Sequence, residues 1–505
     1  MLDGSASHRV FKISELTSAI ASCLVPISRG SAANLARTCR FLEEPALSAL
    51  WENQSQLETL LEVLPEETRE CKYSSAFGGL MVRGLDLLFE ISNVGSWLFQ
   101  FRIVEEPSPE AWNRVRRYAF WMRVLNMDER LALGEDAFRR FRLNAPAGGW
   151  FPALRILHCT TTAHSLPYID LLFSSQLETV SIFIPQWGPS TISKNLLPSL
   201  ASSISSLPAS ALRSLWISHV MPSRDLENSI SSIVLRCGPL LTHITSAIPL
   251  SDAAVNHLIQ LPSLRIWIIE GPPPNYSNSS LPPVFPPLKH FTLREGVTRK
   301  WLSLFQRLED RAAAAPGVTP LSRLKESLES LNIGGYPGPI IDSSFTSPIR
   351  MFRNIIRLGV RACCHSDRCN FKLNNNDVTE LVMALPQLED LILGFPCPQN
   401  TCVTTAACLL PISVYCVRLR ELEIHFNTTR IADDLESIPM DPGFPELRSL
   451  PRCKLGRLRA HEMPLVLDMS DFQAVVDWMR DIFPSIQGIE GPPGTWSELS
   501  RKLKA

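Results

Sequence analysis

The sequence predicts an α/β protein in which a small N-terminal all-helical domain precedes an irregular solenoid, with a parallel sheet on the concave face and helices outside. Two observations support this fold class. A short apolar phrase recurs through residues 150–505, and residues 1–65 carry a helical apolar stripe outside that repeat. Residues 66–149 are expected to form a connecting segment with an N-terminal cap or the first divergent repeats.

Length and charge limit the function classes. The 505 residues exceed the roughly 250–300 at which one hydrophobic core stops growing, so the chain is multidomain or an elongated repeat array. The 49 basic and 50 acidic residues leave a formal charge of -1. This balance gives no electrostatic reason to expect nucleic acid or a membrane surface as a partner.

The N-terminal stripe consists of Ile13, Leu16, Ile20 and Leu24, which recur at spacings of three, four and four and so share one helix face. The stretch "NLARTCRFLEEPALSALW" follows at Asn34–Trp51. Together they make a unit of about 45 residues, too small for a self-sufficient core. We therefore expect it to leave apolar surface for another chain, with Trp51 anchoring it to the solenoid.

The segment "AWNRVRRYAFWMRVL" interleaves arginine with aromatic residues, a combination that can bind nucleic acid. Trp112, Val115 and Ala119 have helical spacing. With a neutral total charge, this spacing favours a packed helix of the first repeat or of an adaptor segment.

The recurring phrase is an apolar residue, two others, a second apolar residue, one other and a third apolar residue. Period-two apolar positions suit a strand with one buried face, and the leading residue enters the same core from the preceding turn. Successive copies begin 23–40 residues apart, as in leucine-rich repeats. The phrase reads "ALRILHC", "QLETVSI", "ALRSLWI", "LLTHITS", "SLRIWII", "PLKHFTL", "SLESLNI", "NIIRLGV", "QLEDLIL", "RLRELEI" and "ELRSLPR".

Helical segments precede several phrases. Those from Asp252 and Asp377 each begin at an aspartate placed as an N-cap and stop at a proline. Such a helix–strand unit cannot bury its apolar face alone, so neighbours stack. The segment from Ala474, with Ile486 and Ile489 in strand positions, is predicted to cap the array. The charge-free stretch of residues 391–417 is predicted to contain a buried helix rather than a membrane span.

Sequence motifs that would indicate a metal site or catalysis are sparse. The stretch "RACCHSDRCN" groups Cys363, Cys364, His365 and Cys369, but without the paired spacing of structural zinc sites. No nucleophile elbow, phosphate-binding loop or kinase signature is present. We therefore predict no enzyme, no metal and no cofactor, although a metal-dependent activity built on these cysteines is an alternative.

The first dozen residues have no apolar stretch after a basic start, so we expect no secretory signal. The chain is therefore expected in the cytoplasm or nucleus, where its 13 cysteines act as small apolar residues.

The stretch "ISELTSAIASCL" followed by "NLARTCRFLEEPALSALW" resembles an F-box, with "TCRF" and the later "LW" matching best. The layout is similar to F-box-like proteins with leucine-rich repeats that are expanded in mushroom-forming fungi. The resemblance implies a substrate-recognition subunit of an SCF-type cullin-RING ubiquitin ligase, which binds a SKP-type adaptor through the F-box and an unidentified target through the repeats. The residues implied as adaptor-binding or F-box core are Ile13, Leu16, Ile20, Leu24, Leu35 and Cys39. Because the F-box departs from its usual pattern, with Ser14 in place of proline, the alternative is a leucine-rich-repeat scaffold without ligase association.

Overall fold

The structure is a computed structural model of the 505-residue chain, and the chain divides into two compact units, Met1–His243 and Ile244–Ala505. The described residues are 14–38, 40–74, 98–127, 131–160, 166–184, 198, 201–219, 224–273, 284–294, 298–314, 320–334, 340–361, 369–394, 402–428, 431, 453–459, 469–491 and 495–504.

The main sheet is parallel and contains fourteen strands among the described residues, in the order β1-β4-β6-β7-β8-β9-β10-β11-β12-β13-β14-β15-β16-β17. Strands β2, β3 and β5 belong to another sheet. The order of the other strands in the main sheet follows chain order, as expected when each helix–strand repeat stacks on the one before. The predicted α/β fold class with a long parallel sheet is therefore confirmed.

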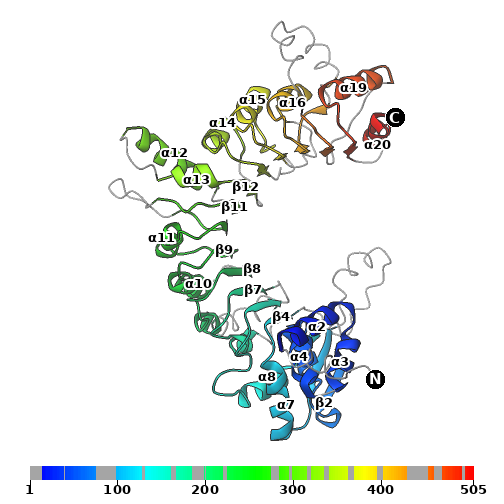
Figure 1. The fold of residues 1–505 in the computed structure, drawn as a ribbon. Coiled ribbons are helices and arrows are strands. Elements are labelled where there is room, and N and C mark those ends of the chain that lie inside the picture. Colours follow the sequence, from blue (N-terminus) through cyan, green and yellow to red (C-terminus); the bar gives the residue numbers. More distant parts are fainter. Residues whose placement is uncertain are drawn as a thin grey trace. The chain divides into compact units, whose positions relative to one another are not determined.

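The first unit begins with helices α2 (Ser14–Ile27), α3 (Arg29–Thr38) and α4 (Arg40–Glu52), coloured blue in Figure 1. The main-sheet strands of this unit are β1 (Asn53–Gln54), β4 (Val124–Met127), β6 (Ile156–Thr160), β7 (Thr179–Ile184) and β8 (Ser214–His219), and β9 (His243–Ser246) lies at the unit boundary. Its further helices are α5 (Glu58–Leu61), η1 (Glu66–Thr68), α7 (Pro109–Ala119), α8 (Glu135–Leu143), η3 (Leu166–Leu172) and α10 (Arg224–Arg236).

A second, three-stranded sheet lies in the first unit, with β2 (Arg69–Ser74) antiparallel to β3 (Leu98–Ile103) and β3 parallel to β5 (Leu131–Leu133). Helix α7 begins at Pro109 after the N-cap Ser108, whose hydroxyl accepts a hydrogen bond from the amide of Ala111. The predicted helical face of Trp112, Val115 and Ala119 is buried, so this segment packs into the fold.

The second unit contains strands β10 (Ile266–Ile269), β11 (His290–Arg294), β12 (Ser330–Gly334), β13 (Arg357–Val360), β14 (Asp390–Leu393), β15 (Glu421–Ile424), β16 (Arg457–Arg459) and β17 (Gly488–Glu490). Most helices of this unit lie on one side of these strands, while α20 (Thr495–Lys504) lies beside the last strand (Figure 1). The others are α11 (Asp252–Gln260), α12 (Thr298–Ala314), α13 (Ser322–Ser327), α14 (Ser343–Thr346), η4 (Ser347–Met351), α15 (Asn375–Ala384), η5 (Ala406–Cys408), α16 (Leu409–Tyr415) and α19 (Met469–Ile482).

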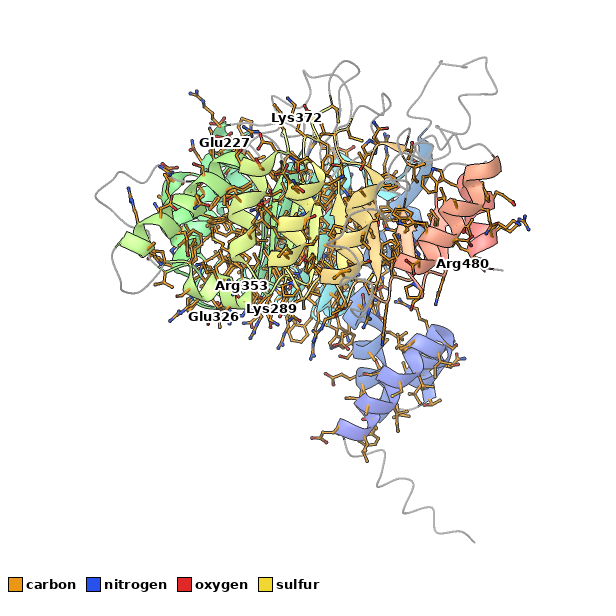
Figure 2. The ribbon with its side chains drawn as sticks, turned by 90° about the horizontal axis from the view of Figure 1, so that it is seen from above. Glu227, Lys289, Glu326, Arg353, Lys372 and Arg480 are labelled. Carbon is orange, nitrogen blue, oxygen red and sulfur yellow. The ribbon has the colours of Figure 1, made fainter. Side chains whose placement is uncertain are left out.

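Figure 2 shows at which edges the parallel strands of the second unit begin and end. Lys289, Glu326 and Arg353 precede strands β11, β12 and β13 and lie on one edge, whereas Lys372, which follows β13, lies on the opposite edge. This arrangement is expected for parallel strands, whose amino ends share one edge of the sheet.

The repeated phrase matches the strands. In the QLEDLIL copy, Leu388, Leu391 and Leu393 are all fully buried, and the phrases from residue 153 through residue 424 place their apolar positions in the core in the same way. The copy "ELRSLPR" lies outside the described residues. The strand after β15 is built instead from "KLGRLRA", with Leu455 and Leu458 buried.

Helix starts in the second unit differ slightly from the prediction. The N-cap of α11 is Ser251 rather than Asp252, and the N-cap of α15 is Asn374 rather than Asp377. Asp377 instead completes a capping box, since its carboxylate accepts from the amide of Asn374 and its own amide donates to the Asn374 side chain, both at 3.0 Å.

Two other predictions for the second unit are confirmed at least in part. The charge-free stretch contains η5 and the short buried helix α16, and none of the helices in the described parts of the chain is long and apolar enough to cross a membrane. Ile489 is buried in β17 as predicted, whereas Ile486 is buried in the turn before this strand rather than in it, and α20 follows the strand.

Candidate functional site

The N-terminal helices α2, α3 and α4 pack around a core of small residues. The cluster comprises Ala21, Ala36, Ala46 and Ala49, with Val25, Leu35 and Leu47 packed against it. Alanine buries little apolar surface, so this core stabilises the three helices only weakly. Leu42 of α4 is also buried, but several larger apolar side chains of the same helices are exposed instead.

Helix α2 has two neighbouring apolar stripes. Thr17 and Ala21 face the core and are 2 % and 0 % exposed, whereas Leu16 and Ile20 lie beside them and are 44 % and 40 % exposed. Leu24 is half-buried. The periodicity of the predicted stripe is therefore helical, but Leu16 and Ile20 point to solvent rather than to the core.

Two further large apolar side chains of this domain are exposed. Ile27, at the end of α2, is 81 % exposed, and Phe41, in α4, is 59 % exposed. Of the other predicted site residues, Leu35 is half-buried against the alanine core, while Ile13 and Cys39 lie outside the described residues. Leu16 and Ile20 thus belong to an exposed apolar surface and Leu35 to the core, a distinction that sequence spacing alone did not make.

Helices α2, α3 and α4 are joined to the rest of the first unit by ring and charge contacts. Trp51 of α4 stacks on Tyr118 of α7, with ring centroids 4.7 Å apart and planes 21° apart. The Glu43 carboxylate pairs with Arg117 at 3.0 Å on one flank of this stack. The anchoring role predicted for Trp51 therefore has a defined partner within the same unit.

The backbone continues this join into the main sheet. The amide of Arg123 donates to the carbonyl of Glu52 at 2.9 Å, immediately before β1 pairs with β4. The Arg29 guanidinium donates to the carbonyl of Leu50 at 3.1 Å and to the Gln54 side chain at 3.0 Å. Helices α3 and α4 are thereby tied to the first strand of the sheet.

Glu58 lies in α5, directly after this join. Its side chain is buried, and its Oε1 atom has no hydrogen-bond partner among the described residues. Burial raises the pKa of Glu58 to about 7, with the nearby carboxylate of Glu62 adding to the effect of desolvation. Sequence reasoning missed this group, because a glutamate in "LETLLEVLP" is ordinarily an exposed helix residue.

Residues considered for chemistry do not assemble into a site within the described regions. Cys402 and Cys408 are buried and Cys369 is half-buried, while Cys363, Cys364 and His365 lie outside the described residues. Among the described residues, no group of three or more His, Cys, Asp or Glu could hold a metal ion. Burial raises the pKa of the Cys159, Cys237 and Cys416 thiols to about 12, so they stay protonated.

His425 is the most perturbed histidine of the second unit among the described residues. It follows β15 and is 4 % exposed, and its Nε2 atom has no hydrogen-bond partner in the described part of the chain. Burial lowers its pKa to about 4. The neighbouring Gly394 has a φ of +93°, and a Cβ there would lie 2.9 Å from the Cβ of His425. The histidine is thus a neutral, closely packed core residue.

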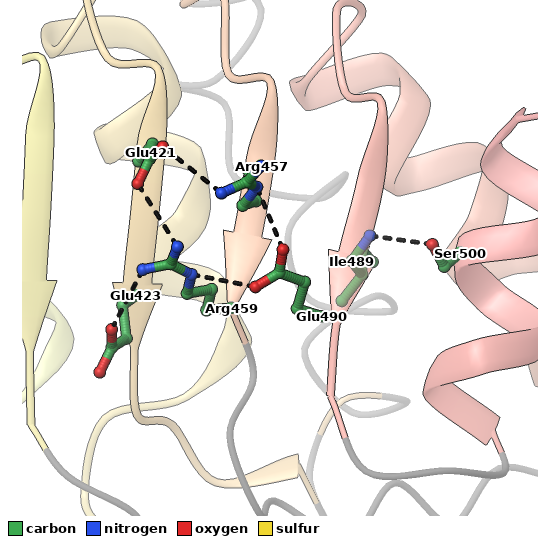
Figure 3. A network of polar contacts seen from close by, with 7 residues as sticks. All are labelled: Glu421, Glu423, Arg457, Arg459, Ile489, Glu490 and Ser500. Atoms are coloured by element: carbon green, nitrogen blue, oxygen red, sulfur yellow. Dashed lines mark hydrogen bonds and ion pairs between the residues drawn. The ribbon is translucent and has the colours of Figure 1, made fainter. Parts of the chain in front are cut away.

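A network of charged side chains crosses the last strands of the second unit (Figure 3). Arg459 pairs with Glu490 at 3.0 Å and approaches Glu421 at 3.8 Å and Glu423 at 4.0 Å. Arg457 pairs with Glu490 at 3.1 Å. These side chains occupy the half-buried or exposed alternate positions of β15, β16 and β17, whose other positions are buried. The charges are therefore already matched within the sheet.

The edge strand β17 is also covered by α20. The amide of Ile489 donates to the hydroxyl of Ser500 at 3.1 Å (Figure 3). A helix that occupies the hydrogen-bonding groups of an edge strand limits pairing with other chains. The alternation of Glu and Arg with Leu in "ELEI" and "GRLRA" was the available sequence signal for this network.

Comparison with known proteins gives no family assignment: no family description matches the chain, and no curated protein is significantly similar to it.

Proposed function

We propose that the chain is the substrate-recognition subunit of an SCF-type cullin-RING ubiquitin ligase. The N-terminal helices would dock on a SKP-type adaptor, and the sheet would hold the target, in the cytoplasm or nucleus. Such a receptor performs no chemistry itself, because holding the target near the ligase raises its effective concentration. The proposal starts from the F-box resemblance of the N-terminal sequence.

One structural observation carries the proposal furthest. The helical domain has an alanine core, while Leu16, Ile20, Ile27 and Phe41 are 40–81 % exposed. Leu16 and Ile20 lie one turn apart on α2, and adjacent exposed apolar residues are characteristic of a binding surface for another protein. Burying a leucine or isoleucine side chain contributes roughly 1.5–3 kcal/mol, so a few such residues supply useful affinity.

The join to the sheet supports the same function. A receptor must hold its target in a defined orientation, and the Trp51–Tyr118 stack with the Glu43–Arg117 pair fixes the helices to the first unit through several separate contacts. A flexible tether would instead have shown few contacts of this kind.

Co-purification with the adaptor tests the proposal. The full chain, co-expressed with a SKP-type adaptor, should retain it, and Leu16→Asp combined with Ile20→Asp should abolish retention. The matched control is Ser18→Asp combined with Ser22→Asp, which places two aspartates at the same spacing on another exposed part of α2. If the wild-type chain does not retain the adaptor, or if both double variants retain it equally, the alternative of a scaffold without ligase association is favoured.

A further inference from the structure

The exposed face of β6, β7 and β8 in the first unit is uncharged. Buried and outward positions alternate along these strands, with Leu157, Val180 and Leu215 in the core. The outward rows contain no Asp, Glu, Lys or Arg among the described side chains. In register, these rows are Ile156–Thr179–Ser214, His158–Ser181–Trp216 and Thr160–Phe183–Ser218, and we call them the neutral aromatic face.

Two large aromatic side chains stand on this face. Trp216 is 49 % exposed and Phe183 is 39 % exposed. Trp216 lies opposite Ser181, two residues before Phe183 on the adjacent strand. Strands about 4.8 Å apart with a rise of about 3.3 Å per residue place the two Cα atoms about 8 Å apart, so both rings can contact one bound segment.

Charged residues border this face at the edge where the strands begin. Glu178, which immediately precedes β7, pairs with Arg155 at 3.5 Å and with Arg213 at 3.3 Å. Because these three charges pair with one another, they form a polar rim beside an uncharged centre. An apolar centre with a polar rim is the usual layout of a protein–protein interface.

The outward face of β15–β17 in the second unit has the opposite chemistry. There the arginines and glutamates pair with one another, and a target would have to displace or desolvate these pairs in order to bind. On the neutral aromatic face no such pairs stand in the way among the described side chains, and tryptophan is the residue type most enriched at interface hot spots.

We propose that the neutral aromatic face is the target-docking surface, and that it takes an uncharged protein segment bearing an aliphatic or aromatic side chain. A charged side chain buried there would lose its hydration without finding an opposite charge in the rows. Serine, threonine and histidine side chains can hydrogen-bond to the backbone of an uncharged segment. This inference rests on the proposed function, since it locates the target of the receptor.

Peptide display against the full chain tests the inference. The probe is a library of short random peptides, selected on the wild-type chain and then measured against Trp216→Ala and Trp216→Arg. We expect enriched peptides that are poor in charged residues and bind both variants at least about tenfold more weakly. Phe120→Ala is the control, because Phe120 is an exposed aromatic residue at the end of α7, away from this face, and its loss should leave binding unchanged.

Several outcomes would overturn the inference: no enriched peptide, enrichment of charged peptides, or equal binding by wild type and Trp216→Ala. Binding of an oligosaccharide array that depends on Trp216, with no peptide binding, would overturn the protein segment as occupant. Adaptor binding by Trp216→Ala separates the two proposals. If peptide binding depends on Trp216 but neither the wild type nor Trp216→Ala binds the adaptor, the proposed ligase function is wrong and the proposed docking surface is still supported.

Discussion

Glu58 provides a prediction with a defined sign and size. Its pKa is raised from 4.5 to about 7 by burial, so the folded chain keeps a proton that the unfolded chain releases between these pH values. At about 1.4 kcal/mol per pKa unit, ionisation of Glu58 costs the folded state about 3 kcal/mol. The stability associated with the neutral acid is therefore complete below about pH 4.5 and lost as the pH rises through about 7.

Glu58→Gln should remove this dependence because the amide does not ionise. At about pH 8 the variant should be more stable than the wild type by up to about 3 kcal/mol, and at about pH 4 the two should be equal. Hydrogen–deuterium exchange of peptides covering residues 53–68 measures this locally, with an expected difference in opening equilibrium of about a hundredfold at the higher pH. Glu66→Gln, at an exposed position, is the control.

The reasoning would be refuted if Glu58→Gln had no effect at about pH 8, or if its stabilising effect were larger in acid than in base. Either result would mean that Glu58 is ionised in the folded chain, and that water or an unrecognised donor solvates its carboxylate.

Two further predictions concern other buried or half-buried side chains. Burial lowers the pKa of His425 from 6.5 to about 4, so its contribution to folding stability is complete above about pH 6.5 and falls by up to about 3 kcal/mol as the pH drops towards 4. Hydrogen–deuterium exchange of residues 421–428 should show this loss in acid for the wild type. An equal loss in His425→Leu would contradict the prediction. Trp51→Ala should remove the stack on Tyr118 and cost about 2 kcal/mol locally, seen as faster limited proteolysis after α4. Phe120→Ala is the control for the tryptophan variant, and unchanged cleavage in Trp51→Ala would disprove the anchoring role.

The repeat array could be predicted from sequence because its signal is local and repeated. Buried strand positions such as Leu391 and Leu393 recur at period two after a leading leucine, so one irregular copy would not obscure the rest. The strand after β15 was harder to predict, since "KLGRLRA" ends the phrase on a small alanine and places arginines between its apolar positions. That strand is held by pairing with both neighbours, which a single phrase does not contain.

The candidate site was only partly predictable. Periodicity identifies that Leu16, Ile20 and Leu24 share a face, but exposure depends on which neighbouring face receives α3 and α4. Thr17 and Ala21 were the core residues because their small side chains allow the helices to approach closely. Trp216 and Phe183 were likewise hidden in strand phrases, where only the sheet register reveals that they share the exposed face.

Affinity for the adaptor is the measurement that tests the central claim most directly. By isothermal titration of a SKP-type adaptor into the full chain, the wild type should bind, and Leu16→Asp with Ile20→Asp should weaken binding at least about a hundredfold, since two buried apolar side chains together contribute about 3 kcal/mol or more. Ser18→Asp with Ser22→Asp should bind like the wild type. Absence of binding by the wild-type chain, or equal affinity of the two double variants, would contradict the account.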